Sequence, residues 1–169
     1  MTLGLLPSRW RVFPANWLTP RPRPPLLVSL GGVSMSLRHK AREFALQMLF
    51  QWDLSPQEPA KLEDKFWRGA RAALNTRQFA SKLFAGAAAE AAVLDELIAR
   101  HSENWRIERL SSIDRAILRL GVYEMRDGET PPKVVLNEAV ELAKKFSSED
   151  AAPFINGVLD AVRKSMKNK

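Results

Sequence analysis

Apolar residues recur along most of this chain at the spacing of one helix face. The segment 36–53 shows the pattern clearly, with apolar residues separated by one, three or four positions. Such positions form a single stripe on a helix of 3.6 residues per turn, so we predict a helix whose stripe packs into a core. The stripe consists of Ala41, Phe44, Ala45, Met48, Leu49 and Trp52.

The same spacing predicts further helices and no strands. None of the remaining segments alternates apolar and polar residues as a half-buried strand does. The sequence therefore predicts an all-α protein, a compact bundle of about six or seven helices. The further helices are expected over residues 60–74, 77–102, 112–127 and 135–146, with a last helix that opens at Ser148 and extends through Val162.

Polar and glycine residues mark several of the expected helix ends. Asn75 and Thr76 offer an N-cap for the helix at 77–102, and Ser111 offers one for the helix at 112–127. Gly128 follows the latter helix and is the expected stop signal, because glycine adopts the left-handed conformation at little cost. Pro153 is tolerated because it falls in the first turn of the last helix.

One predicted helix has only small side chains in its middle. The run Ala85-Gly86-Ala87-Ala88-Ala89 lets another helix approach closely, and Gly86 is also a candidate position for a bend. A second interpretation places residues 85–92 in the interface of a homodimer. The spacing by itself does not separate the two.

Residue usage excludes several kinds of chemistry. The chain has no cysteine and two histidines, His39 and His101, which lie far apart in the sequence. Disulfides, thiolate metal sites and cysteine nucleophiles are therefore excluded, and a zinc site or a Ser-His-Asp triad is not expected. The sequence also lacks a glycine-rich phosphate loop followed by lysine and serine. We expect no metal and no cofactor.

The carboxylates fall beside cations at helix-surface spacing, which is typical of solvated ion pairs and not of an acid and base pair. We therefore expect no catalysis. No apolar run approaches the roughly 20 residues that cross a bilayer, so a soluble protein without a membrane partner is expected. The carboxylates concerned are Glu138 and Glu141 near Lys144 and Lys145, and Asp114 near Arg115.

The first 34 residues differ from the rest. Residues 1–34 hold six of the eleven prolines and four arginines but no acid, so the other 22 of the 26 Lys and Arg stand against all 19 acidic residues in 35–169. Proline at this density opposes helix formation, and a signal peptide's apolar region is missing. We interpret 1–34 as a Pro-rich basic extension upstream of a true start at Met35. A disordered arm that assists RNA binding and an organellar transit peptide are the alternatives.

Cations gather at the start of the first predicted helix. Arg38, His39, Lys40 and Arg42 lie close together and suit a polyphosphate backbone. In a first helical turn they oppose the macrodipole, and a bound phosphate relieves that conflict. The alternative is a solvated basic start to an ordinary helix.

Four segments of the chain form a recognisable set: RHKAREFALQMLFQWD at 38–53, IDRAILRLGVYEM at 113–125, VVLNEAVELAKKF at 134–146 and FINGVLD at 154–160. Together they resemble the NusB family of bacterial transcription antitermination and termination factors. The resemblance covers Met35 to about Val162 in family order, and Asn104-Trp105 matches an element between helices. Residues 1–34 have no counterpart in the family.

The resemblance implies a non-catalytic, cytoplasmic, all-helical RNA-binding protein. Its implied partners are ribosomal protein NusE of the small subunit, boxA-type single-stranded RNA of ribosomal RNA leader transcripts and the RNA polymerase elongation complex. The implied role is suppression of premature termination. NusB-like domains also occur beside the catalytic domain of RNA 5-methylcytosine methyltransferases, and some NusB-like proteins form homodimers, which leaves both as alternatives.

The resemblance also implies site residues. Arg38, His39, Lys40 and Arg42 are expected to contact RNA. Phe154 is expected to stack on a base, with packing in the core as the alternative. The residues expected to face the NusE partner are Glu108 and Asp150.

Overall fold

A computed structural model describes residues 30–102 and 107–167 of the protein. Within those residues the fold is all-α, as predicted, with seven α-helices, one short 3-10 helix and no strand. None of these helices is long and apolar enough to cross a membrane. The elements are α1 (Leu30–Leu54), α2 (Pro59–Gly69), α3 (Leu74–Ala89), α4 (Ala91–His101), η3 (Ile107–Arg109), α5 (Ser112–Asp127), α6 (Pro132–Phe146) and α7 (Ala151–Lys167).

Two of the sequence-based predictions fall partly or wholly outside the described residues. Asn104-Trp105 lies outside them, as does most of the predicted extension, residues 1–29. Helix α1 begins at Leu30, so residues 30–34 of that predicted extension are helical.

The predicted apolar stripe of α1 is confirmed. Ala41, Phe44, Ala45, Met48 and Leu49 are buried, and Trp52 is partly buried against the same core. The burial is wider than the stripe, because α1 packs against α2, α3 and α5. Three residues outside the predicted stripe, Arg42, Glu43 and Leu46, are therefore buried as well.

The helix predicted at 77–102 is two helices. Helix α3 begins at Leu74 after Ala73, so the N-cap predicted at Asn75 and Thr76 is wrong. The chain leaves helical geometry at Glu90, which ends α3 and precedes α4. A continuous apolar period does not reveal such a break, because both helices bury residues at helical spacing on either side of it.

Helix α5 is the centre of the bundle, and both of its predicted ends are confirmed. The Ser111 hydroxyl accepts a hydrogen bond from the backbone N–H of Asp114 at 3.2 Å, and Gly128 ends the helix with φ 76°. Every residue from Ala116 to Met125 is buried, because α1, α3, α4, α6 and α7 all pack against α5.

The small residues of α3 receive a side chain of α5. A Cβ built at Gly86 would lie 2.1 Å from Cζ and Oη of Tyr123, so only glycine leaves room for the ring there. Ala87 and Ala88 are buried beside it. The prediction of a close helix crossing is confirmed, and this crossing is where the small residues are used.

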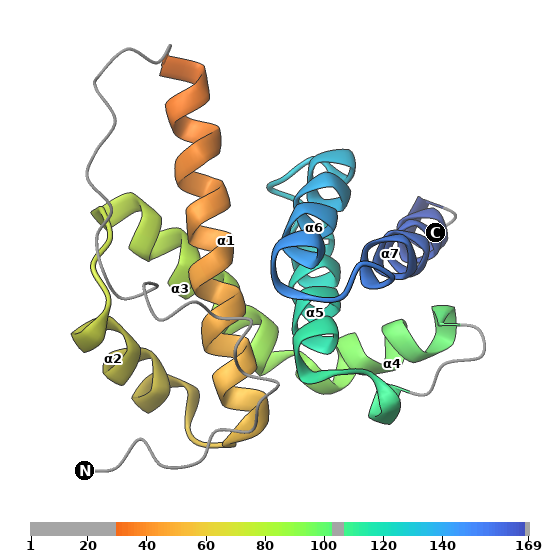
Figure 1. The fold of residues 1–169 in the computed structure, drawn as a ribbon, viewed down its shortest axis with the longest axis horizontal. Coiled ribbons are helices and arrows are strands. Elements are labelled where there is room, and N and C mark those ends of the chain that lie inside the picture. Colours follow the sequence, from red (N-terminus) through yellow and green to blue (C-terminus); the bar gives the residue numbers. More distant parts are fainter. Residues whose placement is uncertain (1–29, 103–106, 168–169) are drawn as a thin grey trace.

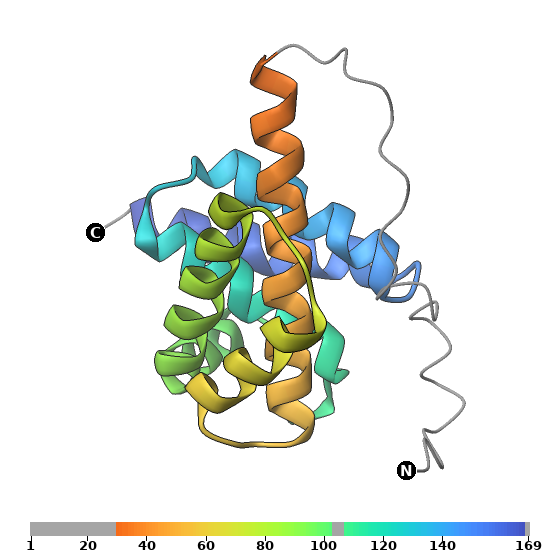
Figure 2. The same ribbon diagram turned by 90° about the vertical axis from the view of Figure 1, so that its left-hand side faces the viewer.

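The helices form two groups around the contact between α1 and α5. Helices α2 and α3 lie on one side of α1, and α4, α6 and α7 surround α5 on the other (Figure 1). The beginning of α1 extends beyond the other helices in both views (Figures 1 and 2). The predicted basic segment lies just after this extension, where α1 enters the bundle.

Candidate nucleic-acid interface

The basic segment of α1 lies inside the helix and not in its first turn. Helix α1 begins at Leu30, two turns before Arg38. The free backbone N–H groups of a helix belong to its first four residues, and the macrodipole acts mainly within the first turn. The prediction that these cations oppose the helix dipole is therefore wrong, because they do not lie in the first turn. Any anion at this segment is bound by side chains.

Arg42 is a buried structural residue. Its side chain is 2% exposed, and its Nε donates a hydrogen bond to Oε2 of Glu124 at 3.0 Å while Nη2 bonds the other oxygen. The hydroxyl of Thr130 donates to the same carboxylate at 2.7 Å. The Arg42 guanidinium is thus enclosed and paired within the protein. Contact between Arg42 and RNA stays a prediction.

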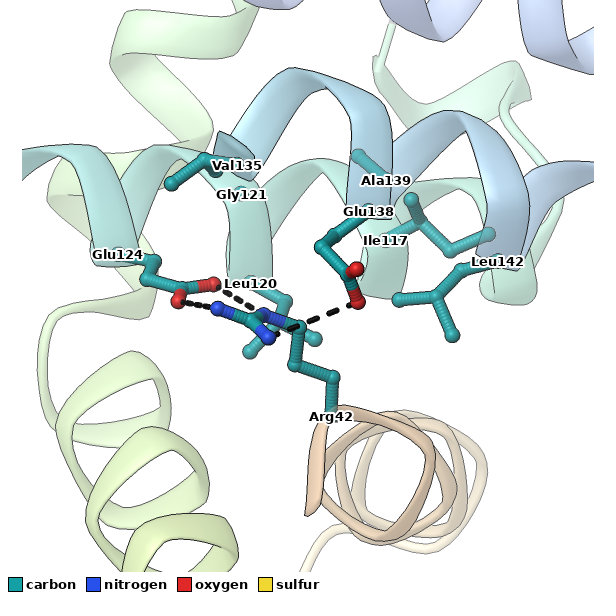
Figure 3. A pocket seen from close by; sticks show the side chains of 9 residues that line it. All are labelled: Arg42, Ile117, Leu120, Gly121, Glu124, Val135, Glu138, Ala139 and Leu142. Atoms are coloured by element: carbon teal, nitrogen blue, oxygen red, sulfur yellow. Dashed lines mark hydrogen bonds and ion pairs between the residues drawn. The ribbon is translucent and has the colours of Figure 1, made fainter. Parts of the chain in front are cut away.

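The Arg42 guanidinium lies between two carboxylates. Glu124 of α5 holds it on one side, and Oε2 of Glu138 of α6 lies 3.5 Å from Nη1 on the other (Figure 3). The remaining walls of this narrow pocket are apolar or small side chains: Ile117, Leu120, Gly121, Val135, Ala139 and Leu142. The arrangement joins α1 to both α5 and α6 through one side chain.

His39 joins α1 to α6 nearer the surface. Its Nδ1 lies 2.8 Å from Oε2 of Glu138, and its Nε2 lies 3.3 Å from Oε1 of Glu43. The ring is about one-third exposed, with both nitrogens facing carboxylates. Contact between His39 and RNA stays a prediction.

Two lysines from different helices meet at Glu43. The Glu43 side chain is 4% exposed, and Lys40 Nζ donates to its Oε2 at 2.8 Å. Lys145, from the last turn of α6, donates to its Oε1. Burial raises the pKa of Glu43, but the hydrogen bonds and charges of Lys145 and Lys40 outweigh that effect and hold the pKa below its ordinary value. Glu43 is therefore a carboxylate anion beneath two exposed ammonium groups.

Arg38 is exposed and lies over an aromatic ring of α3. Its Cζ is 5.3 Å from the centre of the Phe79 ring, and Arg42 lies 5.5 Å from the same ring. Both distances are within the range of a cation–π attraction. Phe79 therefore restrains the Arg38 guanidinium while leaving it open to solvent.

Three exposed cations thus lie in this region: Arg38 of α1 beside α3, and Lys40 of α1 and Lys145 of α6, which share Glu43. Within the residues that the structure describes, no group of three or more His, Asp or Glu side chains is arranged to hold a metal ion.

The sequence profile of the NusB family matches residues 39–164, which include α1 from its basic segment onward and nearly all of α7. The chain belongs to the NusB family.

Curated relatives support this membership along nearly their whole lengths. The transcription antitermination protein NusB of a Nitratiruptor species is 43% identical over 134 residues, which cover 79% of this chain and 96% of that protein. The protein of the same name from Solibacter usitatus is 43% identical over 134 residues, covering 78% and 92% respectively.

Solved NusB structures have the same fold. A crystal structure of antitermination factors NusB and NusE in complex with dsRNA contains a chain that is 32% identical, with a TM-score of 0.69, and the match covers 78% of this chain and 98% of that one. NusB of T. maritima matches with 31% identity and a TM-score of 0.68, over 75% of this chain and 90% of that one.

The remaining residues implied by the NusB resemblance lie away from the basic segment in sequence. Phe154 is in the first turn of α7 and is partly buried against the core. Helix α6 lies between α1 and α7 (Figure 1). Packing thus accounts for part of the Phe154 ring, and its role in base stacking stays a prediction.

Glu108 and Asp150 are both exposed. Glu108 lies in η3, just before α5, and Asp150 lies in the connection that follows α6. A hydrogen bond between the Ser147 hydroxyl and the Asp114 carboxylate joins these two regions. Both acids are therefore near this junction of α5 and α6 along the chain, and their contact with a protein partner stays a prediction.

The sequence did not predict that Glu43, Glu138 and Lys145 would contact the cations of α1 or lie beside them. It expected ion pairs within α6, and one of them is present, with Lys144 Nζ 2.9 Å from Oε1 of Glu141. Glu138 and Lys145 instead pair with residues of α1. Helical spacing suggests local partners but carries no information about a helix that packs alongside.

The expected pair between Asp114 and Arg115 is also corrected. Asp114 accepts hydrogen bonds from the hydroxyls of Ser111 and Ser147. Arg115 donates to Asp53 at the end of α1, at 2.7 Å. Adjacent helical residues point in different directions, so each side chain meets the element on its own side.

Proposed function

We propose that this protein is a non-catalytic transcription antitermination factor that binds boxA-type single-stranded RNA together with ribosomal protein NusE of the small subunit. In this role it joins the RNA polymerase elongation complex in the cytoplasm and supports processive transcription of ribosomal RNA leaders. The observation that carries the proposal is the match to the NusB chain of a NusB–NusE–dsRNA crystal structure over 98% of that chain.

The electrostatics of the described surface support an RNA partner. Arg38 and Lys40 of α1 are exposed, and neither is enclosed as Arg42 is. Exposed cations release counterions from a nucleic-acid backbone when they bind it, which makes affinity depend steeply on salt. The proposed RNA contacts are therefore Arg38, His39 and Lys40, with Phe154 as the proposed base-stacking residue.

The name of a relative that this chain covers almost completely favours an antitermination factor over the enzyme-linked alternative. The chain covers 96% of the Nitratiruptor protein, which is named as an antitermination protein. The homodimer alternative has weaker support, because Gly86 of the small-residue run faces Tyr123 of the same chain.

The test is RNA binding by the full chain across a salt series, with and without the NusE protein. The proposal expects tighter binding of a boxA-type RNA than of a scrambled RNA, further strengthening by NusE, and loss of affinity as salt rises. Alanine at both Arg38 and Lys40 is expected to make the slope of log K against log salt shallower by about 0.7 per lost phosphate contact. Binding that is indifferent to RNA sequence and to NusE would overturn the proposal.

A further inference from the structure

We propose that the RNA-binding surface continues from α1 onto α6, where Lys145 contacts a backbone phosphate and the buried carboxylate of Glu43 positions it beside Lys40. The inference rests on the proposed RNA-binding function and adds to it a cation from a second helix and a positioning residue. The juxtaposition that carries it is one carboxylate holding two exposed ammonium groups.

Lys145 forms its ion pair with a residue of another helix. The preceding lysine, Lys144, pairs with Glu141 within α6, as is usual on a solvated helix surface. Lys145 instead crosses to Glu43 of α1, although its side chain is 52% exposed. The contact brings the end of α6 to the basic segment of α1 and adds a cation to that surface.

Both lysines keep donors for a further acceptor. An ammonium group has three N–H donors, and each lysine gives one to Glu43. The side chains of Lys40 and Lys145 are 51% and 52% exposed, so an anion can approach both lysines from solvent. A phosphate oxygen is a suitable acceptor because it carries negative charge and the two cations outnumber the single anion below them.

Aromatic rings restrain the same two side chains. Lys40 Nζ lies 5.0 Å from the centre of the Phe44 ring, and Lys145 Nζ lies 5.2 Å from that of Phe146. A lysine that is already restrained loses less conformational freedom when it binds a ligand than a freely moving lysine does. Glu43 and the rings thus prepare both cations for binding.

Glu43 provides a test in which two mechanisms predict opposite results. If Glu43 acts only through its charge, then Glu43→Gln removes a negative charge near the RNA and strengthens binding. If Glu43 positions the lysines, glutamine holds them less firmly than the carboxylate does. RNA binding then becomes weaker, although the surface is more positive. The proposal expects the second result.

The first experiment compares neighbouring lysines in the full chain. Binding of a boxA-type single-stranded RNA is measured across a salt series for the parent, Lys145→Ala and Lys144→Ala. We expect Lys145→Ala to make the salt slope shallower by about 0.7, the value for one phosphate contact on a single strand. Lys144→Ala is the matched control and is expected to keep the parent slope. Lys145→Arg, which keeps the charge, is expected to keep it as well.

Equal slopes for Lys145→Ala and the parent would overturn the inference. Equal losses for Lys145→Ala and Lys144→Ala would also overturn it, because they would indicate a general effect of surface charge. If Lys145→Ala weakens binding of the NusE protein but leaves binding of RNA alone unchanged, the surface recognises a protein and the inference is wrong.

The second experiment measures the RNA affinity of Glu43→Gln, with helicity and urea unfolding recorded on the same sample. A folded variant with weaker binding supports the positioning role, and stronger binding overturns it. If Glu43→Gln does not fold, Glu43→Asp replaces it, since it keeps the charge but withdraws the carboxylate from both lysines. The proposed function has a separate failure: a parent chain that binds no RNA overturns both, whereas a parent that binds with an unchanged Lys145→Ala slope overturns only this inference.

Discussion

Arg42 of α1 and Glu124 of α5 form a buried ion pair, with Nε donating to Oε2 at 3.0 Å and Nη2 donating to Oε1. Both side chains are almost fully enclosed. Removing charges from water is unfavourable, and the pair persists because the planar guanidinium matches both carboxylate oxygens and Thr130 satisfies the carboxylate further. This pair connects the first helix of the bundle to the central one.

Replacing Arg42 with alanine is expected to destabilise the fold by roughly 3–5 kcal/mol, because Glu124 then stays buried without its cation. Urea unfolding of the variant and the parent measures the difference. Arg38→Ala is the control: it removes an exposed arginine of the same helix and is expected to change stability by less than about 1 kcal/mol. Similar losses for the two variants would contradict the structural role of Arg42.

A second arginine joins three helices. Arg119 of α5 donates to Asp53 of α1 at 2.9 Å and, through Nε and Nη2, to Asp95 of α4 at 2.6 Å. Arg119→Ala is expected to reduce the free energy of unfolding by roughly 1.5–3 kcal/mol, the range for hydrogen bonds to charged groups. The same urea experiment measures it.

The control for Arg119 is Arg100→Ala. Arg100 pairs with Glu96 within α4, where both side chains are exposed, so its loss is expected to cost about 0–1 kcal/mol. A result in which Arg100→Ala costs as much as Arg119→Ala would show that the link between α1, α4 and α5 is not what stabilises this region.

Gly86→Ala is expected to destabilise the protein although alanine is a better helix former. The added Cβ would lie 2.1 Å from the Tyr123 ring, and accommodating extra volume in a packed core costs roughly 1–3 kcal/mol. Gly157→Ala in α7 is the matched control, because its Cβ meets nothing within 4 Å. That control is expected to stabilise by up to about 1 kcal/mol. Thermal unfolding of both variants tests the opposite signs.

Acid is expected to weaken the contact between α1 and α6. The pKa of Glu43 in the folded protein lies below its ordinary value of 4.5, so the unfolded chain takes up a proton first as pH falls. The stability that Glu43 contributes is therefore present above about pH 4.5 and is lost as pH falls through the lower folded value.

The measurement is urea unfolding of the parent and Glu43→Gln between about pH 3 and pH 7, at constant ionic strength. The glutamine variant lacks this proton uptake, so its stability is expected to fall less steeply below about pH 4.5. Parallel curves for the two proteins would mean that Glu43 does not contribute to the acid dependence.

Much of the fold could be predicted because its signals are local. The apolar stripe of α1, the Ser111 cap and the Gly128 stop each depend on a few neighbouring residues, and the structure confirms all three. The division at Glu90 and the start of α3 at Leu74 were not predicted. Their sequence signals are weak, since the residue before α3, Ala73, makes no side-chain cap.

The candidate site could likewise be predicted only where its signals are local. The sequence by itself determined that cations gather near Arg38, that the protein is helical and that it resembles the NusB family. The tertiary structure decided which cations remain available: Arg42 is enclosed by α5 and α6, whereas Lys145 is brought to Glu43. The physical reason is that helical period fixes the face on which a side chain lies, while the helix that packs on that face, and the charge it brings, comes from residues far away in the chain.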